Sequence, residues 1–229
     1  MKKHGFYSEI AYVIGLVSIA VGVVFATKAD FGVSMVVAPA YLLYRWLNPS
    51  FGFFTFGMAE YCLQGVLILL TALLVRKFRL SFLFCFVTAV IYGFILDGLT
   101  LLLAFLPTAF LWLRIVYFVI SVLLSGIGVA LMFHTYLTPE AYEMIVKEVS
   151  EHYGIRIHRF KMVYDYISCA VGVIMSFCIF GWFHFVGISW GTVIITLVNG
   201  FLIGACSSFL EKHFEFRDAL PWRDFFTKA

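Results

Sequence analysis

Charged side chains are scarce in this chain. Only 13% of its 229 residues are Asp, Glu, Lys or Arg, whereas 63% are hydrophobic and 19% are aromatic. A soluble domain is closer to half apolar and one-quarter charged, and a chain of this length cannot hide so much apolar surface in one aqueous core. The composition therefore predicts a polytopic membrane protein whose many Phe and Tyr side chains face lipid and the membrane interfaces.

Other scarcities argue against whole classes of function. The five cysteines form no CxxC pair and fall in hydrophobic stretches, which favours reduced, buried side chains over a redox or metal role. The chain has neither a nucleotide-binding motif nor HExxH, and its histidines are scattered, so we expect no cofactor, no metal and no intramembrane enzyme. The formal net charge is only +3 and does not predict nucleic-acid binding.

Six hydrophobic stretches are long enough to cross a bilayer, which requires about 20 mainly apolar residues. The predicted spans are 10–27, 55–75, 82–105, 111–133, 162–182 and 188–210. With these spans, thirteen of the sixteen Lys and Arg residues fall on one side of the membrane. Because such residues concentrate in cytoplasmic loops, we expect both termini in the cytoplasm, with a cytoplasmic tail at 211–229. The first span is too long for a signal peptide and has no clear cleavage site, so we expect it to be retained.

The chain also carries one pattern twice. The matching positions, 105 to 107 residues apart, are Gly22 with Gly128, Glu60-Tyr61 with Asp165-Tyr166, and Tyr92-Gly93 with Asn199-Gly200. Three spans per copy make the second copy enter the bilayer from the opposite side, as in the inverted-topology repeats of secondary transporters. We therefore predict an all-α, six-span bundle of 3+3 design, with repeat one at about 9–106 and repeat two at about 111–210.

A long connector follows the first span of each copy. In the outer connector, Ser34 is a predicted helix cap, and the apolar run at 36–46 is too short to span the bilayer. We therefore expect a broken helix there that either re-enters the bilayer or lies on its surface. In the inner connector, Thr138 and Pro139 predict the start of an amphipathic helix that ends at Gly154. We expect this second helix to lie against the cytoplasmic side of the bundle.

Polar residues at membrane depth or at helix starts are candidates for binding, because an ionisable group inside a span costs roughly 2.5–3.5 kcal/mol on insertion scales. The candidates for binding a substrate or ion are Asp97, Glu60, Asp165, Glu140, Ser34, Asp30, Lys28 and Asn199. The helix starts at Ser34 and Glu140 would favour an anion or carboxylate, with plain capping as the alternative.

Several of these candidates also have an alternative structural explanation. Asp97 has no cation within one helical turn, so its partner must come from another helix or from water. Asp165 has Lys161 four residues before it, which makes a local ion pair the alternative to a binding role. Lys28 and Asp30 sit at the outer end of the first span, where they can reach the interface.

Gly200 and Gly204 form a G-x-x-x-G motif in the sixth span. Small residues at this spacing allow two helices to approach closely. Packing inside the bundle is the favoured explanation, and a homodimer interface is the alternative.

Four stretches of the chain resemble the YczE/YitT-type bacterial membrane proteins. The stretches are Lys28-Ala29-Asp30-Phe31-Gly32-Val33-Ser34, Thr138-Pro139-Glu140, Gly154-Ile155 to Lys161 with Asp165, and Gly187-Ile188-Ser189-Trp190-Gly191-Thr192-Val193-Ile194 with Asn199-Gly200. Met35 stands where the family's outer motif has proline. The resemblance implies a multi-pass protein of the bacterial inner membrane, in a family whose members are labelled predicted membrane proteins or permeases.

These features together favour a small secondary transporter or permease that moves a small organic solute, driven by an ion gradient or by the gradient of the solute. Its expected partners are that solute and membrane lipid. A lipid scramblase or a structural subunit of a larger complex is the alternative.

Overall fold

The computed structural model describes residues 4–78, 80–137, 140–181 and 187–219. The elements in this part of the chain are β1 (His4–Tyr7), α1 (Ser8–Ala29), α2 (Ala38–Leu47), α3 (Phe56–Val75), α4 (Leu80–Leu102), α5 (Leu111–Phe133), α6 (Ala141–Tyr153), α7 (Ile157–Phe180), α8 (Trp190–His213) and β2 (Phe214–Arg217). Six of these helices are long and apolar enough to cross a membrane, namely α1, α3, α4, α5, α7 and α8.

The chain is therefore an all-α, multi-pass membrane protein, as its composition predicts. Each predicted span coincides with one long helix, although the predicted end of the fifth span, Trp182, lies outside the described residues. The two four-residue strands were not predicted from the sequence.

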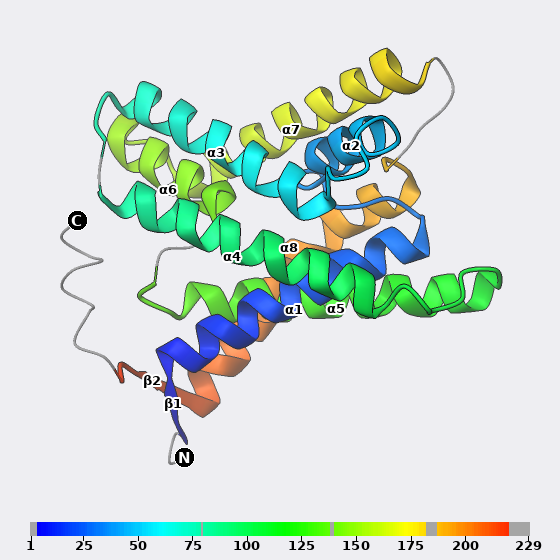
Figure 1. Cartoon of the computed structure of the whole chain (residues 1–229). Helices are drawn as coiled ribbons and strands as arrows, with labels where there is room; N and C mark the ends of the chain where they lie inside the picture. Colours follow the sequence, from blue (N-terminus) through cyan, green and yellow to red (C-terminus); the bar gives the residue numbers. More distant parts are fainter. Residues whose placement is uncertain (1–3, 79, 138–139, 182–186, 220–229) are drawn as a thin grey trace.

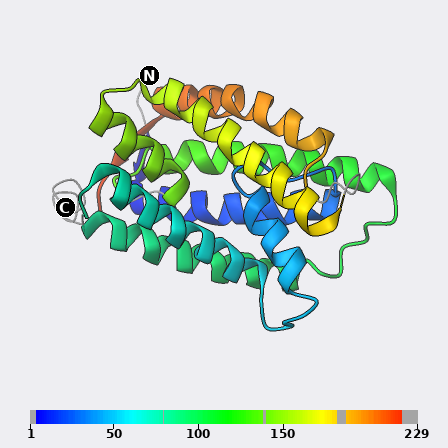
Figure 2. The ribbon, with the colours of Figure 1, turned by 90° about the horizontal axis from the view of Figure 1, so that it is seen from above.

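The helices form two layers (Figure 1; Figure 2). One layer contains α2, α3, α6 and α7, and the other contains α1, α4, α5 and α8. Helix α4 joins the layers because it packs along α3 and also contacts α6. The largest apolar core includes Ala20 and Val24 of α1, Tyr92 and Leu96 of α4, and residues of α2. The layers thus meet at an apolar core around α1, α2 and α4.

Helices α1 and α5 make the most extensive helix–helix contact of the bundle, and they cross at glycines. A Cβ atom added at Gly15 would lie 2.9 Å from the carbonyl oxygen of Gly128, and one added at Gly128 would lie 2.7 Å from the carbonyl oxygen of Gly15. A Cβ atom added at Gly22 would lie 3.0 Å from the carbonyl oxygen of Ser121. At the 106-residue offset Gly15 matches Ser121 and Gly22 matches Gly128, so a two-fold operation exchanges the two contacts.

Most other helix pairs follow the same exchange. The contact of α1 with α4 corresponds to that of α5 with α8, and the contact of α2 with α7 corresponds to that of α6 with α3. Helices α3 and α4 pack closely through Gly57 and Gly93, whereas α7 and α8 pack little against each other. At the offsets of the repeat, Met162 replaces Gly57, and this larger side chain cannot allow the same close approach of the two backbones.

The segments next to the two termini lie at the same end of the bundle. Strand β1 pairs in parallel with β2, with Phe6 opposite Phe216 (Figure 1). The Ser8 hydroxyl donates to Asp218, and the Ala219 N–H donates to the Glu9 carboxylate at 3.0 Å. This arrangement places the described N- and C-terminal segments side by side, as an even number of spans requires.

Both short helices start later than the sequence predicted. Helix α2 begins at Ala38, and its N-cap residue is Val37 with no side-chain hydrogen bond, so the prediction that Ser34 caps it was wrong. Ser34 contributes only its carbonyl oxygen, which accepts from the N–H groups of Val37 and Ala38. Pro39 in the first turn explains the later start, because proline suits the first helical positions.

Helix α6 has Glu140 as its N-cap residue and begins at Ala141. The predicted cap, Thr138, and the predicted first helical residue, Pro139, therefore precede the helix and lie outside the described residues. The predicted stop is confirmed, because Gly154 ends α6 with a φ of 64°.

The G-x-x-x-G motif of α8 does not pack inside the described part of the chain. A Cβ atom added at Gly200 or at Gly204 would meet nothing within 4 Å. The prediction that this motif packs within the bundle was wrong, because α8 turns a different face towards Gly126 of α5.

Candidate functional site

The best candidate site lies where the half-length helix α6 begins. The Ala141 N–H donates to the Gln64 side-chain oxygen of α3 at 3.3 Å, and the Tyr153 hydroxyl donates to the Leu74 carbonyl oxygen at 3.0 Å. Helix α6 therefore runs beside α3 over about 15 Å, from Gln64 to the end of the spanning helix. Its N-terminus thus lies beside the third turn of α3, and its C-terminus lies beside the end of α3.

Five polar side chains from three helices meet at this start, and each is buried. Glu60 and Gln64 come from α3, Tyr92 from α4, and Glu140 and Tyr142 from α6, with exposed fractions between 0% and 5%. We call these five residues the buried polar cluster. The Tyr142 hydroxyl donates to Glu60 Oε2 at 2.7 Å, so a direct hydrogen bond fixes α6 against α3.

Four atoms of the buried polar cluster lack a hydrogen-bond partner. They are Glu60 Oε1, Gln64 Nε2, Tyr92 OH and Glu140 Oε1. The Gln64 amide faces the Glu60 carboxyl, but no hydrogen bond of acceptable geometry joins them. A buried polar group without a partner costs about 1–3 kcal/mol, so four of them in one place mark a site that a bound ligand would complete.

Acidic groups dominate the electrostatics of this cluster. Burial raises the pKa of Glu140 well above its usual range, and the nearby carboxyls of Glu143 and Glu60 raise it further. Glu143, one turn along α6, has Lys161 and Asp165 of α7 as charged neighbours. These two α7 residues form an ion pair of 3.3 Å, with side chains 36% and 27% exposed. A line of charged groups therefore connects the buried cluster with a partly exposed pair on α7.

This arrangement suits a positive ligand better than an anion. The N-terminus of a helix usually attracts anions through its N–H groups. Here the Gln64 oxygen already accepts from Ala141, and the carboxyls of Glu60 and Glu140 are buried at the same end of the helix. An incoming carboxylate would meet two acidic side chains.

Asp97 lies outside the buried polar cluster. Its carboxylate accepts from the Thr55 hydroxyl at 2.6 Å and from the Gly57 N–H at 2.7 Å. Its partners thus come from another helix, whereas the sequence had left open either another helix or water as the source. Thr55 is the N-cap of α3, so Asp97 stabilises a helix N-terminus. At the offsets of the repeat its counterpart is Gly204, which cannot make the same link to α7.

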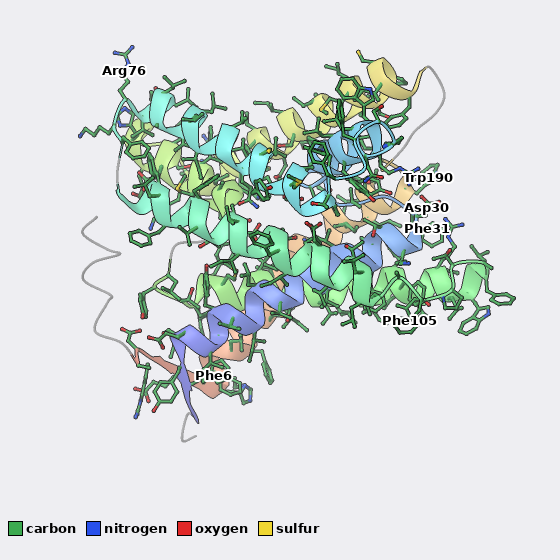
Figure 3. The ribbon with its side chains drawn as sticks, in the orientation of Figure 1. Phe6, Asp30, Phe31, Arg76, Phe105 and Trp190 are labelled. Atoms are coloured by element: carbon green, nitrogen blue, oxygen red, sulfur yellow. The ribbon has the colours of Figure 1, made fainter. Side chains whose placement is uncertain are left out.

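Lys28 and Asp30 lie at one end of α1, far along the chain from the cluster. Arg114 of α5 donates to the Ala29 carbonyl oxygen at 2.7 Å and pairs with the Asp30 carboxylate at 3.1 Å. The Lys28 ammonium donates to the Ala104 carbonyl oxygen at 3.2 Å. Figure 3 shows Asp30 beside Phe31 at the end of the bundle opposite to Arg76. These hydrogen bonds and this ion pair hold the end of α1 against its neighbours, so Lys28 and Asp30 have a structural role here.

The remaining sequence candidates are also separate from the cluster. Asp165 forms the local ion pair with Lys161 that was its structural alternative. Asn199 is on α8, and its buried Oδ1 atom has no hydrogen-bond partner. Of the eight candidates, the structure brings only Glu60 and Glu140 together.

Sequence reasoning missed three members of the cluster. Gln64 lies four residues after Glu60, so helical periodicity already places both on one face of α3. Tyr142 lies on the buried apolar face of α6, where only its hydroxyl is polar, and the structure uses that hydroxyl in a hydrogen bond to Glu60. Tyr92 appeared only as a repeat match.

The segments 28–34 and 187–194 meet at one end of the bundle. The Val33 N–H donates to the Gly187 carbonyl oxygen at 2.9 Å, and the Gly191 N–H donates to the Phe31 carbonyl oxygen at 2.8 Å. Gly32 has a φ of 105°, which favours glycine. The two hydrogen bonds hold these segments together, so the two segments stabilise the fold.

The fold and the cluster define a multi-pass helical membrane protein with a buried polar site beside a half-length helix. Residues 6–208 match the model of a family of unknown function, DUF6198, and the chain belongs to that family. No curated protein and no solved structure matches the chain.

Proposed function

We propose that this protein is a small secondary transporter of the bacterial inner membrane that moves a small organic solute, with both termini in the cytoplasm. The buried polar cluster carries the proposal, because four partnerless polar atoms gather at a helix that starts inside the bundle. Binding sites of secondary transporters are commonly built from such interrupted helices between two related halves. The resemblance to YczE/YitT-type proteins supports the same proposal.

The exchange of contacts between the two copies supports a transport mechanism. Reciprocal packing of α1 and α5 is what an inverted repeat would produce. The close packing of α3 with α4 and the loose packing of α7 with α8 make the two halves differ in shape.

Lipid is the partner that we propose for α8. Only 6% of its most apolar window is buried, against 33–44% for α1, α3, α4 and α5. The side chains of Leu197 and Phe201 are 68% and 84% exposed, and apolar side chains on a spanning helix are stable against acyl chains.

A substrate screen tests the proposed transport. Purified protein is heated with each member of a panel of small organic solutes, because a ligand that binds the native state raises its apparent stability. Compounds that stabilise the protein are then tested for exchange in proteoliposomes, with Glu60→Gln as the matched variant. We expect exchange by the wild type that this variant reduces. Stabilising compounds that show no exchange would contradict transport.

A further inference from the structure

The buried polar cluster contains two carboxyl groups and no basic side chain. Glu60 is 0% exposed and Glu140 is 5% exposed. The salt bridges recorded among the described residues join Arg114 with Asp30, His134 with Glu211, Lys161 with Asp165, and Arg217 with Glu215. Two buried carboxyls without a positive partner cannot both ionise at a reasonable energy. One of them must therefore hold a proton unless a cation enters.

Two neutral side chains beside this acidic pair also have unused polar atoms. Tyr92 is 1% exposed and Gln64 is 0% exposed, yet the Tyr92 hydroxyl and the Gln64 Nε2 group have no hydrogen-bond partner. Tyr92 has both Glu60 and Glu140 as electrostatic neighbours. The phenol oxygen and the two free carboxyl oxygens are thus buried oxygen atoms whose capacity to bind a ligand is unused.

The ligand class follows from the charge of these groups. An anion would be repelled by the carboxyl that stays ionised. A monovalent cation carries the same charge as the one proton that leaves, so the net charge of the buried pair stays the same when the two exchange.

We propose that Glu60 and Glu140 form a site where a monovalent cation, either an alkali ion or a small protonated amine, exchanges with a proton. When the cation enters, the O–H bond of the protonated carboxyl breaks and its proton leaves to solvent. The cation then contacts the two carboxylates. When the cation leaves, a proton from solvent returns to one carboxylate, so charge balances in both directions. This inference rests on the proposed function and names the coupling ion of that same site.

The groups that face Glu140 come from several helices. They are Glu60 on α3, Glu143 and Tyr142 on α6, Tyr12 on α1, and Cys85 and Tyr92 on α4. Glu143 alone is next to a basic side chain, Lys161, and that side chain is already paired with Asp165. The competition between cation and proton is therefore assigned to Glu60 and Glu140.

Thermal unfolding of the full chain in detergent tests the exchange site. Sodium chloride, potassium chloride and methylammonium chloride are the three probes, with choline chloride keeping the ionic strength constant. We expect at least one probe to raise the midpoint temperature at alkaline pH. Because one proton competes, the apparent affinity should weaken about tenfold for each pH unit in the acidic range. The probe that raises the midpoint temperature shows whether the site binds an alkali ion or a small protonated amine.

Variants and a proton measurement make the test specific. Glu60→Gln and Glu140→Gln should abolish the cation effect, while Asp165→Asn should keep it because its carboxyl lies outside the cluster. If the glutamine variants do not fold, the wild type still decides: adding the cation to weakly buffered protein should release about one proton per chain. No stabilisation by any probe at alkaline pH, or no proton release, would overturn the exchange site.

Failure of this site and failure of transport give different results. If the protein exchanges solute but binds no cation, the proposed cation site is wrong and the proposed transport stands. If the protein binds a cation and releases a proton but transports no solute, the proposed cation site stands and the proposed transport is wrong.

Discussion

Adding one methyl group at Gly128 should disrupt the crossing of α1 and α5. The new Cβ atom would lie 2.7 Å from the Gly15 carbonyl oxygen and 3.0 Å from the Ile19 backbone nitrogen. Both are backbone atoms of α1, so neither can rotate away, and the two helices must separate. Overpacking of this kind costs about 1–3 kcal/mol, and we expect Gly128→Ala to lower the free energy of unfolding by that amount.

Gly204→Ala is the matched control because it adds the same methyl group to a spanning helix. Its Cβ atom would meet nothing within 4 Å. Alanine favours a helix over glycine by about 0.5–1 kcal/mol, so this variant should be neutral or slightly more stable.

The assay is thermal unfolding of the purified protein, followed by tryptophan fluorescence. One kcal/mol shifts the midpoint of a domain of this size by about 2–4 °C, so the two variants should differ by at least about 2 °C. Gly22→Ala should behave like Gly128→Ala, because the two-fold exchange of contacts relates the two positions. Equal midpoints for Gly128→Ala and Gly204→Ala would refute the packing argument.

Three further outcomes are expected. Asp97→Ala should lower stability by about 1–3 kcal/mol, because the Thr55 hydroxyl and the Gly57 N–H lose their acceptor; an unchanged melting curve would contradict this. The raised pKa of Glu140 means that the native state holds its proton more tightly than the unfolded state does. Stability should therefore fall as pH rises from 4.5 towards the raised value, and pH titration of Glu140→Gln should show a smaller fall. Reporter fusions should place both termini in the cytoplasm, and a periplasmic C-terminus would contradict the inverted repeat.

Composition and periodicity were sufficient to predict the six spans. A hydrophobic run of about 20 residues has one stable structure in a bilayer, because only a helix satisfies its own backbone groups there. For that reason the predicted span at 111–133 and helix α5 have the same bounds. The half-length helices were also predicted, but their depth was not, since depth depends on tertiary hydrogen bonds such as that from Ala141 to Gln64.

The buried polar cluster was only partly predictable because its members lie far apart in the sequence. Glu140 was identified because it stands at the start of a helix, and Glu60 was identified by the cost of burying charge. The same criterion also selected Asp97 and Asp165, whose local partners satisfy them. A charge rule cannot tell a paired carboxylate from an unpaired one until the contacts of its neighbours are known.

The repeat helps to explain why the described residues form this site between the two copies once and do not form it again at the symmetry-related position. The second-copy counterparts of Glu60 and Tyr92 are Asp165 and Asn199, and the first-copy counterpart of Glu140 is Met35. A methionine cannot ionise, so the equivalent position beside α2 lacks the second carboxyl. The departures from symmetry thus coincide with the cluster.

Proton movement in proteoliposomes is the most direct measurement of exchange at Glu60 and Glu140. Vesicles loaded with the cation that stabilises the protein are diluted into medium without it, and a pH-sensitive dye reports the lumen. We predict acidification of the lumen by the wild type and by Asp165→Asn, and none by Glu60→Gln or Glu140→Gln. Acidification that persists in both glutamine variants would contradict exchange at Glu60 and Glu140, and its absence in the wild type would contradict transport of the cation.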